Sequence, residues 1–320
     1  METIGSPLLW VGFVGLVLAM LAVDLGVFHK KARAVGLREA GLWSAVWFAL
    51  AAAFGVGIHL WFGAERALEF ATGYLIEKAL AVDNIFVFVV VFATFGVPAA
   101  YQHRVLFWGV LGALAMRAAF IFAGGAFLQA FHWAIYVFGA VLAVTGGKQL
   151  LQRNAEPHPE RNPLVRLFRR LLPVTESLDG DRFFVRRDGR RFATPLLLAL
   201  VAIEVTDLVF AVDSIPAIFA VTTDPFIVFT SNIFAILGLR SLYFLLAGVI
   251  DRFHYLKVGL SVVLVFVGAK MLLLDVYKIP IAVSLGVIAG ILAASVVASL
   301  LVPRRPAPPA ARGGAEAGRG

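Results

Sequence analysis

The stretch EKALAVDNI at residues 77–85 decides the fold, and the stretch DLVFAVDSI at residues 207–215 repeats its pattern. Each begins with an acid, continues for five residues, and then has Asp followed by a small polar residue, with Ala-Val before this Asp and Ile after it. Both stretches lie inside apolar runs, and an ionised carboxylate at the centre of a bilayer costs at least about 2.5–3.5 kcal/mol. The pattern therefore indicates a membrane protein built by duplication around a polar interior.

The composition requires a membrane. The chain has 320 residues, of which 61% are hydrophobic and 15% charged, whereas soluble domains are about 45–50% apolar and about 25% charged. The apolar residues form repeated runs of about 20, the length of helix that crosses a bilayer, and these runs lack the alternation of β-barrel strands. We predict an all-α polytopic membrane protein with about nine transmembrane helices. The expected spans are Leu8–Phe28, Gly41–Phe62, Ala67–Phe95, Val105–Ala123, Ala126–Gly147, Pro195–Val221, Phe226–Val249, Tyr255–Leu274 and Ile279–Val302.

The basic residues predict the orientation. Lys and Arg concentrate in the odd-numbered loops and the C-terminal tail, while the even-numbered loops contain only Arg66 and Lys278. The positive-inside rule then places the N-terminus outside and the C-terminus in the cytoplasm, and we expect the bacterial inner (plasma) membrane. Because these charges lie between spans, the net charge of +8 does not indicate a nucleic-acid partner. The acidic start, residues 1–5, does not resemble a cleaved signal peptide, so we expect the first span to be retained.

The similarity between the two acidic stretches extends downstream. Arg117 precedes Gly124 much as Arg240 precedes Gly248, so spans three to five repeat as spans six to eight. An odd number of spans separates equivalent elements, so the repeats run in opposite directions, a common plan for secondary transporters that bind their substrate near the midplane. The expected divisions are two N-terminal helices (1–66), a first three-helix repeat (67–150), a cytoplasmic Arg-rich loop (151–194), a second repeat (195–275), a last helix (276–302) and a disordered tail (303–320).

The loop at 151–194 is the only long hydrophilic segment between spans. Asp188-Gly189 is a turn signal, and the apolar residues on either side of it predict a short β-hairpin. We expect this loop to be a linker between the repeats, and a regulatory role remains the alternative.

Apart from Glu69 in the first turn of its span, six acids lie within the expected spans. Their possible internal partners are Lys78, Arg117 and Arg240, and three cations cannot neutralise six carboxylates, so the acids must be paired, protonated, hydrated or bound to a cation. The six are Asp24, Glu77, Asp83, Glu204, Asp207 and Asp213.

Helix geometry limits how these acids can meet. Glu77 and Asn84 are seven residues apart and share a helix face, as do Asp207 and Ser214. Each second Asp is six residues from its partner acid, about 120° around a regular helix. We therefore expect a break near both, with Pro216 as one cause and an unwound segment at 81–84, whose freed carbonyls would be ligands.

Oxygen ligands without sulfur suit Mg²⁺, Ca²⁺ or Mn²⁺. For Asp83 and Asp213 the alternative is an ion pair with Arg117 and Arg240, and Glu77 and Asp207 fit either role equally. We expect Asp24 to be structural and Glu204 to be either. Asn232 is a weaker ligand candidate, and we expect it to hydrogen-bond between helices. The predicted metal ligands are Asp83, Asp213, Asn84, Ser214, Glu77 and Asp207.

Several classes of protein are excluded. The chain has no cysteine, so neither thiolate ligands nor thiol chemistry can occur. It contains no His-Glu-x-x-His and no P-loop motif. We expect no catalytic residues, no cofactor and no enzymatic activity.

At these residues the chain resembles the TerC family of integral membrane proteins, associated with tellurium resistance. The resemblance covers about residues 10–300. It is carried by GYLIEK at 73–78, VDN at 82–84, YQHRVLFWG at 101–109, VDSIP at 212–216 and TSNIFAILGLRSLY at 230–243.

The resemblance implies membership of a lysine-exporter-like superfamily, in which several TerC relatives look like manganese exporters. Others are linked to metal-ion homeostasis or membrane-protein assembly. Our first hypothesis is therefore an exporter of Mn²⁺ or a similar divalent cation. The second is a membrane scaffold of a stress-resistance complex, with partner proteins recruited through residues 151–194.

Overall fold

The computed structural model describes residues 3–28, 36–131, 133–151, 163–171, 173–187, 189–247, 253 and 255–302. The described chain is mostly helical, as predicted, with one two-stranded hairpin. The helices are α1 (Pro7–Phe28), α2 (Leu37–Phe62), α3 (Ala64–Thr94), α4 (Ala99–Ala130), α5 (Ala134–Leu151), α6 (Pro163–Leu171), α7 (Pro195–Phe219), α8 (Pro225–Leu237), α9 (Leu239–Leu246), α10 (Leu256–Leu272) and α11 (Ile281–Leu301).

Six helical segments among the described residues are long and apolar enough to cross a membrane: α2, α4, α5, α7, the combined α8–α9 segment and α11. Helix α3 has the necessary length but carries several charged residues, and the apolar part of α1 is shorter. The chain is therefore a polytopic α-helical membrane protein, and the count of nine spans stays a prediction.

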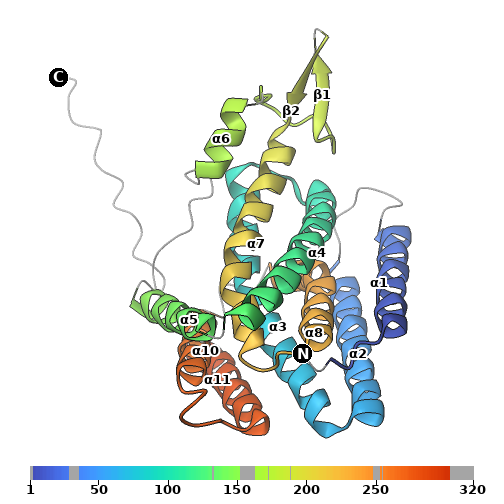
Figure 1. Cartoon of the computed structure of the whole chain (residues 1–320). Helices are drawn as coiled ribbons and strands as arrows, with labels where there is room; N and C mark the ends of the chain where they lie inside the picture. The colour runs from blue at the N-terminus through green and yellow to red at the C-terminus, as the bar shows by residue number, and fades with distance from the viewer. Residues whose placement is uncertain are drawn as a thin grey trace, which may run out of the picture.

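Four helices form the centre of the molecule. Helix α3 packs on α7 and α8, and α4 packs on the same two helices. Figure 1 shows α1 and α2 on one side of this group and α5, α10 and α11 on the other, while α6 and the hairpin lie beyond the first turn of α7. The four central helices therefore enclose any polar site from several directions.

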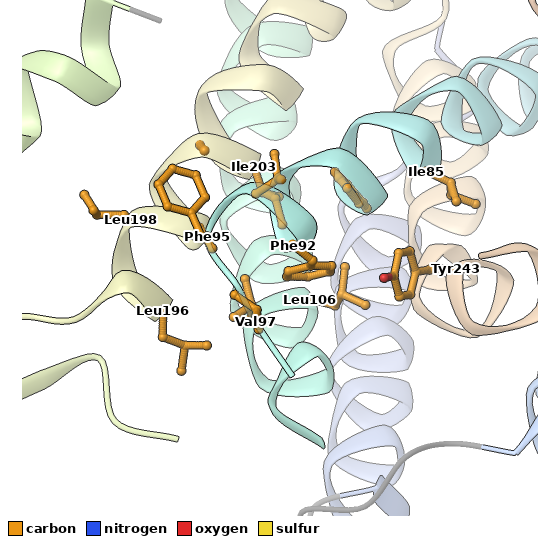
Figure 2. Close-up of a cluster of buried hydrophobic side chains, with 14 of the residues drawn as sticks. Ile85, Phe92, Phe95, Val97, Leu106, Leu196, Leu198, Ile203 and Tyr243 are labelled. Carbon is orange, nitrogen blue, oxygen red and sulfur yellow. The ribbon is translucent and has the colours of Figure 1, made fainter. Parts of the chain in front are cut away.

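The largest apolar cluster joins the second half of α3 to the beginnings of α4 and α7. Phe92, Phe95 and Leu106 are buried in it together with residues of α7, and Tyr243 of α9 packs edge-on against Phe92 at 5.5 Å (Figure 2). The Tyr243 hydroxyl donates a hydrogen bond to Gln102 Oε1 at 2.9 Å. This packing fixes the ends of α3, α4 and α7 and leaves their middle turns to carry polar residues.

The outer helices expose apolar side chains. Leu60 of α2 and Leu301 of α11 are each 75% exposed, and Val144 of α5 is 69% exposed. An exposed apolar surface of this extent marks contact with lipid or another apolar partner. The membrane is therefore needed to cover these faces.

The helix breaks differ from those predicted. Helix α3 is continuous through residues 81–84, and α7 continues through Pro216 to Phe219. The prediction of an unwound segment was wrong, because α3 contains no proline, and Glu77 and Asn84 reach the interior from one face of the regular helix. The break lies instead at Gly238, between α8 and α9.

The predicted hairpin is confirmed. Strand β1 (Phe184–Arg187) pairs antiparallel with β2 (Arg190–Ala193), and Val185 lies opposite Phe192. Gly189 has a φ of 78°, the left-handed region that tight turns require and glycine tolerates best. Helix α6, which the sequence reasoning did not predict, packs on α7. Much of the 151–194 loop is therefore ordered.

Helix α8 begins at a small network of hydrogen bonds around Asp224. Asp224 is its N-cap and accepts a hydrogen bond from the Phe226 amide at 2.9 Å. The same carboxylate accepts bonds from the Thr3 hydroxyl at 2.7 Å and the Ile4 amide at 2.8 Å. Asp224 thereby ties the N-terminal segment to the start of α8.

Glycines bring α5 and α10 into close contact. A Cβ atom at Gly146 would lie 2.7 Å from the Ser261 carbonyl oxygen, and one at Gly268 would lie 2.6 Å from the Gly139 carbonyl oxygen. Small residues at such interfaces let two backbones approach, which drives helix association in lipid. The neighbouring Gly147 has no atom within 4 Å of an added Cβ.

We expect Gly146→Ala to lower the free energy of unfolding by about 1–3 kcal/mol, because the new methyl group overlaps backbone atoms of α10. Gly147→Ala is the matched control and should be neutral or stabilising by up to about 1 kcal/mol through helix propensity. Thermal unfolding in detergent measures both. Equal melting temperatures for the two variants would show that this helix contact is loose.

Candidate functional site

Arg117 of α4 is the centre of a buried polar cluster. Its side chain is 1% exposed and forms a salt bridge with Glu77 of α3. On the other side, its Nη2 donates to Asp207 Oδ1 of α7 at 3.0 Å and its Nε donates to Asp207 Oδ2 at 3.3 Å. A planar guanidinium has the donors to bind Asp207 in this two-bond arrangement and Glu77 at the same time.

Two neutral side chains complete what we call the Arg117 cluster. Asn84 Nδ2 donates to Asp207 Oδ1 at 3.3 Å, and Arg117 Nη1 donates to Ser214 Oγ at 3.3 Å. Helices α3 and α7 are antiparallel at this contact, because Asn84 meets Asp207 near one end and Glu77 shares Arg117 with Ser214 near the other. The cluster consists of Glu77, Asn84, Arg117, Asp207 and Ser214.

The Arg117 cluster has excess negative charge and unused acceptors. One guanidinium faces two carboxylates, so with both ionised the cluster carries a net negative charge. Glu77 Oε2 and Asn84 Oδ1 are buried and have no hydrogen-bond partner among the described residues. A buried acceptor without a partner costs about 1–3 kcal/mol. The site can therefore accept a proton, a water molecule or a cation.

A third acid lies beside the Arg117 cluster. Glu204 is half-buried on α7, three residues before Asp207. Its carboxylate occupies the space where a side chain at Gly112 of α4 would be. The absence of a side chain at 112 is thus what admits Glu204 between α4 and α7, and no ion pair of Glu204 occurs among the described residues.

Asp213 lies apart from the Arg117 cluster. It is half-buried, has Thr145 of α5 beside it, and lines a small cavity of about 30 Å³ with Leu80, Phe210, Gln149 and Leu264. Asp213 does not join the other described ligands in the Arg117 cluster, since the regular turn of α7 directs it away from Asp207, and its role as a metal ligand stays a prediction. Thr145 and Gln149, which the sequence reasoning missed, carry no motif that could have identified them.

Several predicted residues have other positions or lie outside the description. The side chains of Asp83 and Asp24 are not among the described residues. Lys78 donates to the Ala235 carbonyl oxygen of α8 at 3.2 Å, near the break at Gly238. Arg117, expected as an alternative partner of Asp83, binds Glu77 and Asp207.

The described residues contain no group of three or more His, Asp or Glu placed to hold a metal ion. Any cation at the Arg117 cluster would therefore need neutral oxygens and water in addition to the carboxylates. Carboxylate and amide oxygens are ligands that Mg²⁺, Ca²⁺ and Mn²⁺ accept.

Comparison with known proteins identifies the relatives of this chain. The integral membrane protein TerC family matches residues 62–307. A membrane protein of Myxococcus xanthus is 62% identical over 307 residues, covering 95% of this chain and 96% of the relative. The "Putative membrane-bound redox modulator Alx" of Escherichia coli K12 is 52% identical over 302 residues, covering 91% and 94% respectively. A membrane protein of Rickettsia bellii is 41% identical over 292 residues, covering 91% and 97%. No solved structure matches the chain.

We expect Arg117→Leu to lower the free energy of unfolding by about 3–5 kcal/mol, because it leaves two buried carboxylates without their cation. Adding Glu77→Gln and Asp207→Asn to this variant removes both charges and should restore part of the loss. Thermal unfolding and yield in detergent measure the three proteins. A single Arg117→Leu variant as stable as the wild type would show that the carboxylates do not need the guanidinium.

Proposed function

Because this chain belongs to the TerC family of integral membrane proteins, we propose that it is a secondary transporter that exports a divalent metal cation, with Mn²⁺ as the expected substrate. The proposal depends on one observation: the Arg117 cluster holds two buried carboxylates with one guanidinium. A structural ion pair needs only one acid, and a second one adds desolvation cost. Intramembrane acids of this kind mark ion or proton pathways.

The chemistry of the donors favours a hard cation. The acceptors in and beside the Arg117 cluster are carboxylate, amide and hydroxyl oxygens, and the chain has no cysteine to bind a soft metal. Within this proposal Asn84, Ser214, Glu77 and Asp207 belong to one binding region. Asp213, and Asp83 by its place in the sequence repeat, belong to an adjoining step of the path.

The exchange of partners at Arg117 gives a means of coupling. A cation that binds Glu77 or Asp207 weakens the salt bridge of Arg117 with that carboxylate, and a proton on the same carboxylate weakens the same salt bridge. Cation and proton therefore compete for the acids, which is the basis of exchange. Arg117 supplies a positive charge that balances the site between the two events.

The packing of the central helices supports the inverted repeat. The acid of each repeat lies near the small polar residue of the other, Glu77 near Ser214 and Asp207 near Asn84. A two-fold relation within the membrane plane would produce this exchange. Alternating access would then move α3–α5 against α7–α10 around the Arg117 cluster.

The positions of the basic residues indicate the location and orientation of the protein. We infer the bacterial inner membrane, with the N-terminus outside and the hairpin in the cytoplasm, because the hairpin carries exposed arginines. Redox modulation, part of the name of the Alx relatives, would be indirect here, since the chain has no thiol of its own. A contribution to tellurium resistance would be indirect for the same reason.

A membrane scaffold is the second candidate, and the hairpin is the observation that favours it. Arg186 lies opposite Arg191 and Arg187 lies opposite Arg190, and all four are exposed. Like charges directly across a strand pair destabilise it. Their presence on an ordered hairpin therefore suits an acidic partner protein.

The transport proposal predicts a change in cellular manganese. Manganese-sensitive cells lacking their own exporters should accumulate less Mn when they express the wild type than with empty vector. Asp83→Asn combined with Asp213→Asn should return Mn to the empty-vector level, while Glu176→Gln, an exposed acid of the loop, should not. Equal Mn with the wild type and the double variant, at equal membrane abundance, would rule out export through these acids.

If the protein is a scaffold, the stress phenotype should depend on the hairpin arginines and not on the intramembrane acids. Replacing the four hairpin arginines with Gln should abolish the stress phenotype, while the double Asn variant keeps it. Mn content and survival, measured on the same strains, separate the two functions. Loss of Mn export only in the double Asn variant would reject the scaffold.

A further inference from the structure

Asn232 of α8 is a buried polar residue that the packing leaves unsatisfied. Its side chain is 0% exposed, and neither its Oδ1 nor its Nδ2 has a hydrogen-bond partner among the described residues. Its neighbours on α8 differ: Thr230 donates to the Phe226 carbonyl oxygen at 2.8 Å and Ser231 to the Val228 carbonyl oxygen at 3.2 Å. Since a leucine of similar size would avoid the cost of burying the amide, the amide indicates a ligand.

The packing of α4 on α8 places Asn232 at the depth of Arg117. Val228 shares a buried cluster with Ile121, and Ile236 shares one with Ala113. Asn232 lies midway between Val228 and Ile236 on α8, and Arg117 lies midway between Ala113 and Ile121 on α4. Residues four apart lie on one face of a helix, so both residues are on the faces where α4 and α8 meet.

Helix α3 brings two further unsatisfied oxygens to the same region. Gly73 lets α8 approach α3, since a Cβ there would lie 2.9 Å from Ser231 Oγ. One turn further along α3, Glu77 reaches Arg117. Glu77 and Asn84 belong to the Arg117 cluster, and Asn232 lies on the face of α8 toward α4. Glu77 Oε2, Asn84 Oδ1 and both polar atoms of Asn232 have no hydrogen-bond partner among the described residues.

We propose that Asn232 completes the cation site, supplying a neutral oxygen from α8 to a partly hydrated divalent cation that also binds Glu77 Oε2 and Asn84 Oδ1. This inference rests on the proposed transport function and adds a fourth helix to its site. The amide nitrogen donates to a water molecule in the cation's shell. A neutral ligand suits transport, because the site must bind the cation strongly enough for it to enter and weakly enough for it to leave.

The purified full-length protein tests this directly. We expect Mn²⁺ to raise the melting temperature of the wild type, as any ligand of the folded state does. Asn232→Leu should melt higher than the wild type without metal and lose the increase with Mn²⁺. Thr230→Val is the matched control, equally buried and on the same helix, and should keep the full increase. Mg²⁺, Ca²⁺ and Zn²⁺ are compared in the same assay.

Two results would overturn the role of Asn232: a full Mn²⁺-dependent increase in Asn232→Leu, or no increase in the wild type with any of the four cations. If Asn232→Leu does not fold, Asn232→Asp decides, because an added carboxylate ligand should lower the half-saturating Mn²⁺ concentration about tenfold or more, and an unchanged value rejects the site.

Export measured in cells separates this inference from the transport proposal. Wild-type export of Mn²⁺ with equal export by Asn232→Leu rejects the role of Asn232 and leaves transport standing. Equal export by the wild type and the double Asn variant of Asp83 and Asp213 rejects transport through the acids, whatever Asn232 does. Loss of export in both variants, with Thr230→Val unaffected, supports both.

Discussion

The salt bridges of Arg117 are the interaction on which the central structure depends. A guanidinium buried to 1% exposure binds a carboxylate from α3 and another from α7, so three helices meet at one charged group. In lipid, helices gain little from apolar contact with one another, and polar contacts and close packing hold them together. The position of Arg117 therefore fixes how α3, α4 and α7 are arranged, and the apolar clusters at their ends follow.

The same interaction limits what the site can do. Two acids and one guanidinium cannot reach neutrality while both acids are ionised, so the Arg117 cluster is suited to gain a proton or a cation and to lose it again. Glu204, admitted between α4 and α7 by Gly112, adds a third acid beside it. Between α5 and α10, by contrast, glycines bring the two backbones together, and Ser261 of α10 donates a hydrogen bond to Gln149 of α5 at 3.0 Å. The molecule thus combines a charged centre that can change partners with a close backbone contact that depends on glycine.

The relatives support the assignment to the class of membrane proteins. Matching over nearly their whole length, they are membrane proteins as this chain is. A redox role, part of the Alx name, cannot use thiols in a chain without cysteine. The arginine pairs of the hairpin show that charge is also concentrated outside the central helices, where an acidic partner could reach it.

The sequence by itself determined the membrane class, the hairpin and the burial of Glu77 and Asp207, because hydropathy, turn residues and charge are local properties. It also paired Glu77 with Asn84 and Asp207 with Ser214 correctly, since helix periodicity alone sets a shared face. It did not predict that Glu69 and Asp224 are buried. It could not show that α3 is continuous, that Asp213 points toward Thr145, or that Arg117 binds Glu77 and Asp207. Those facts depend on which helices pack together and at what depth. The physical reason is that the partner of each buried carboxylate lies on another helix, distant in the sequence. Only the tertiary structure decided them.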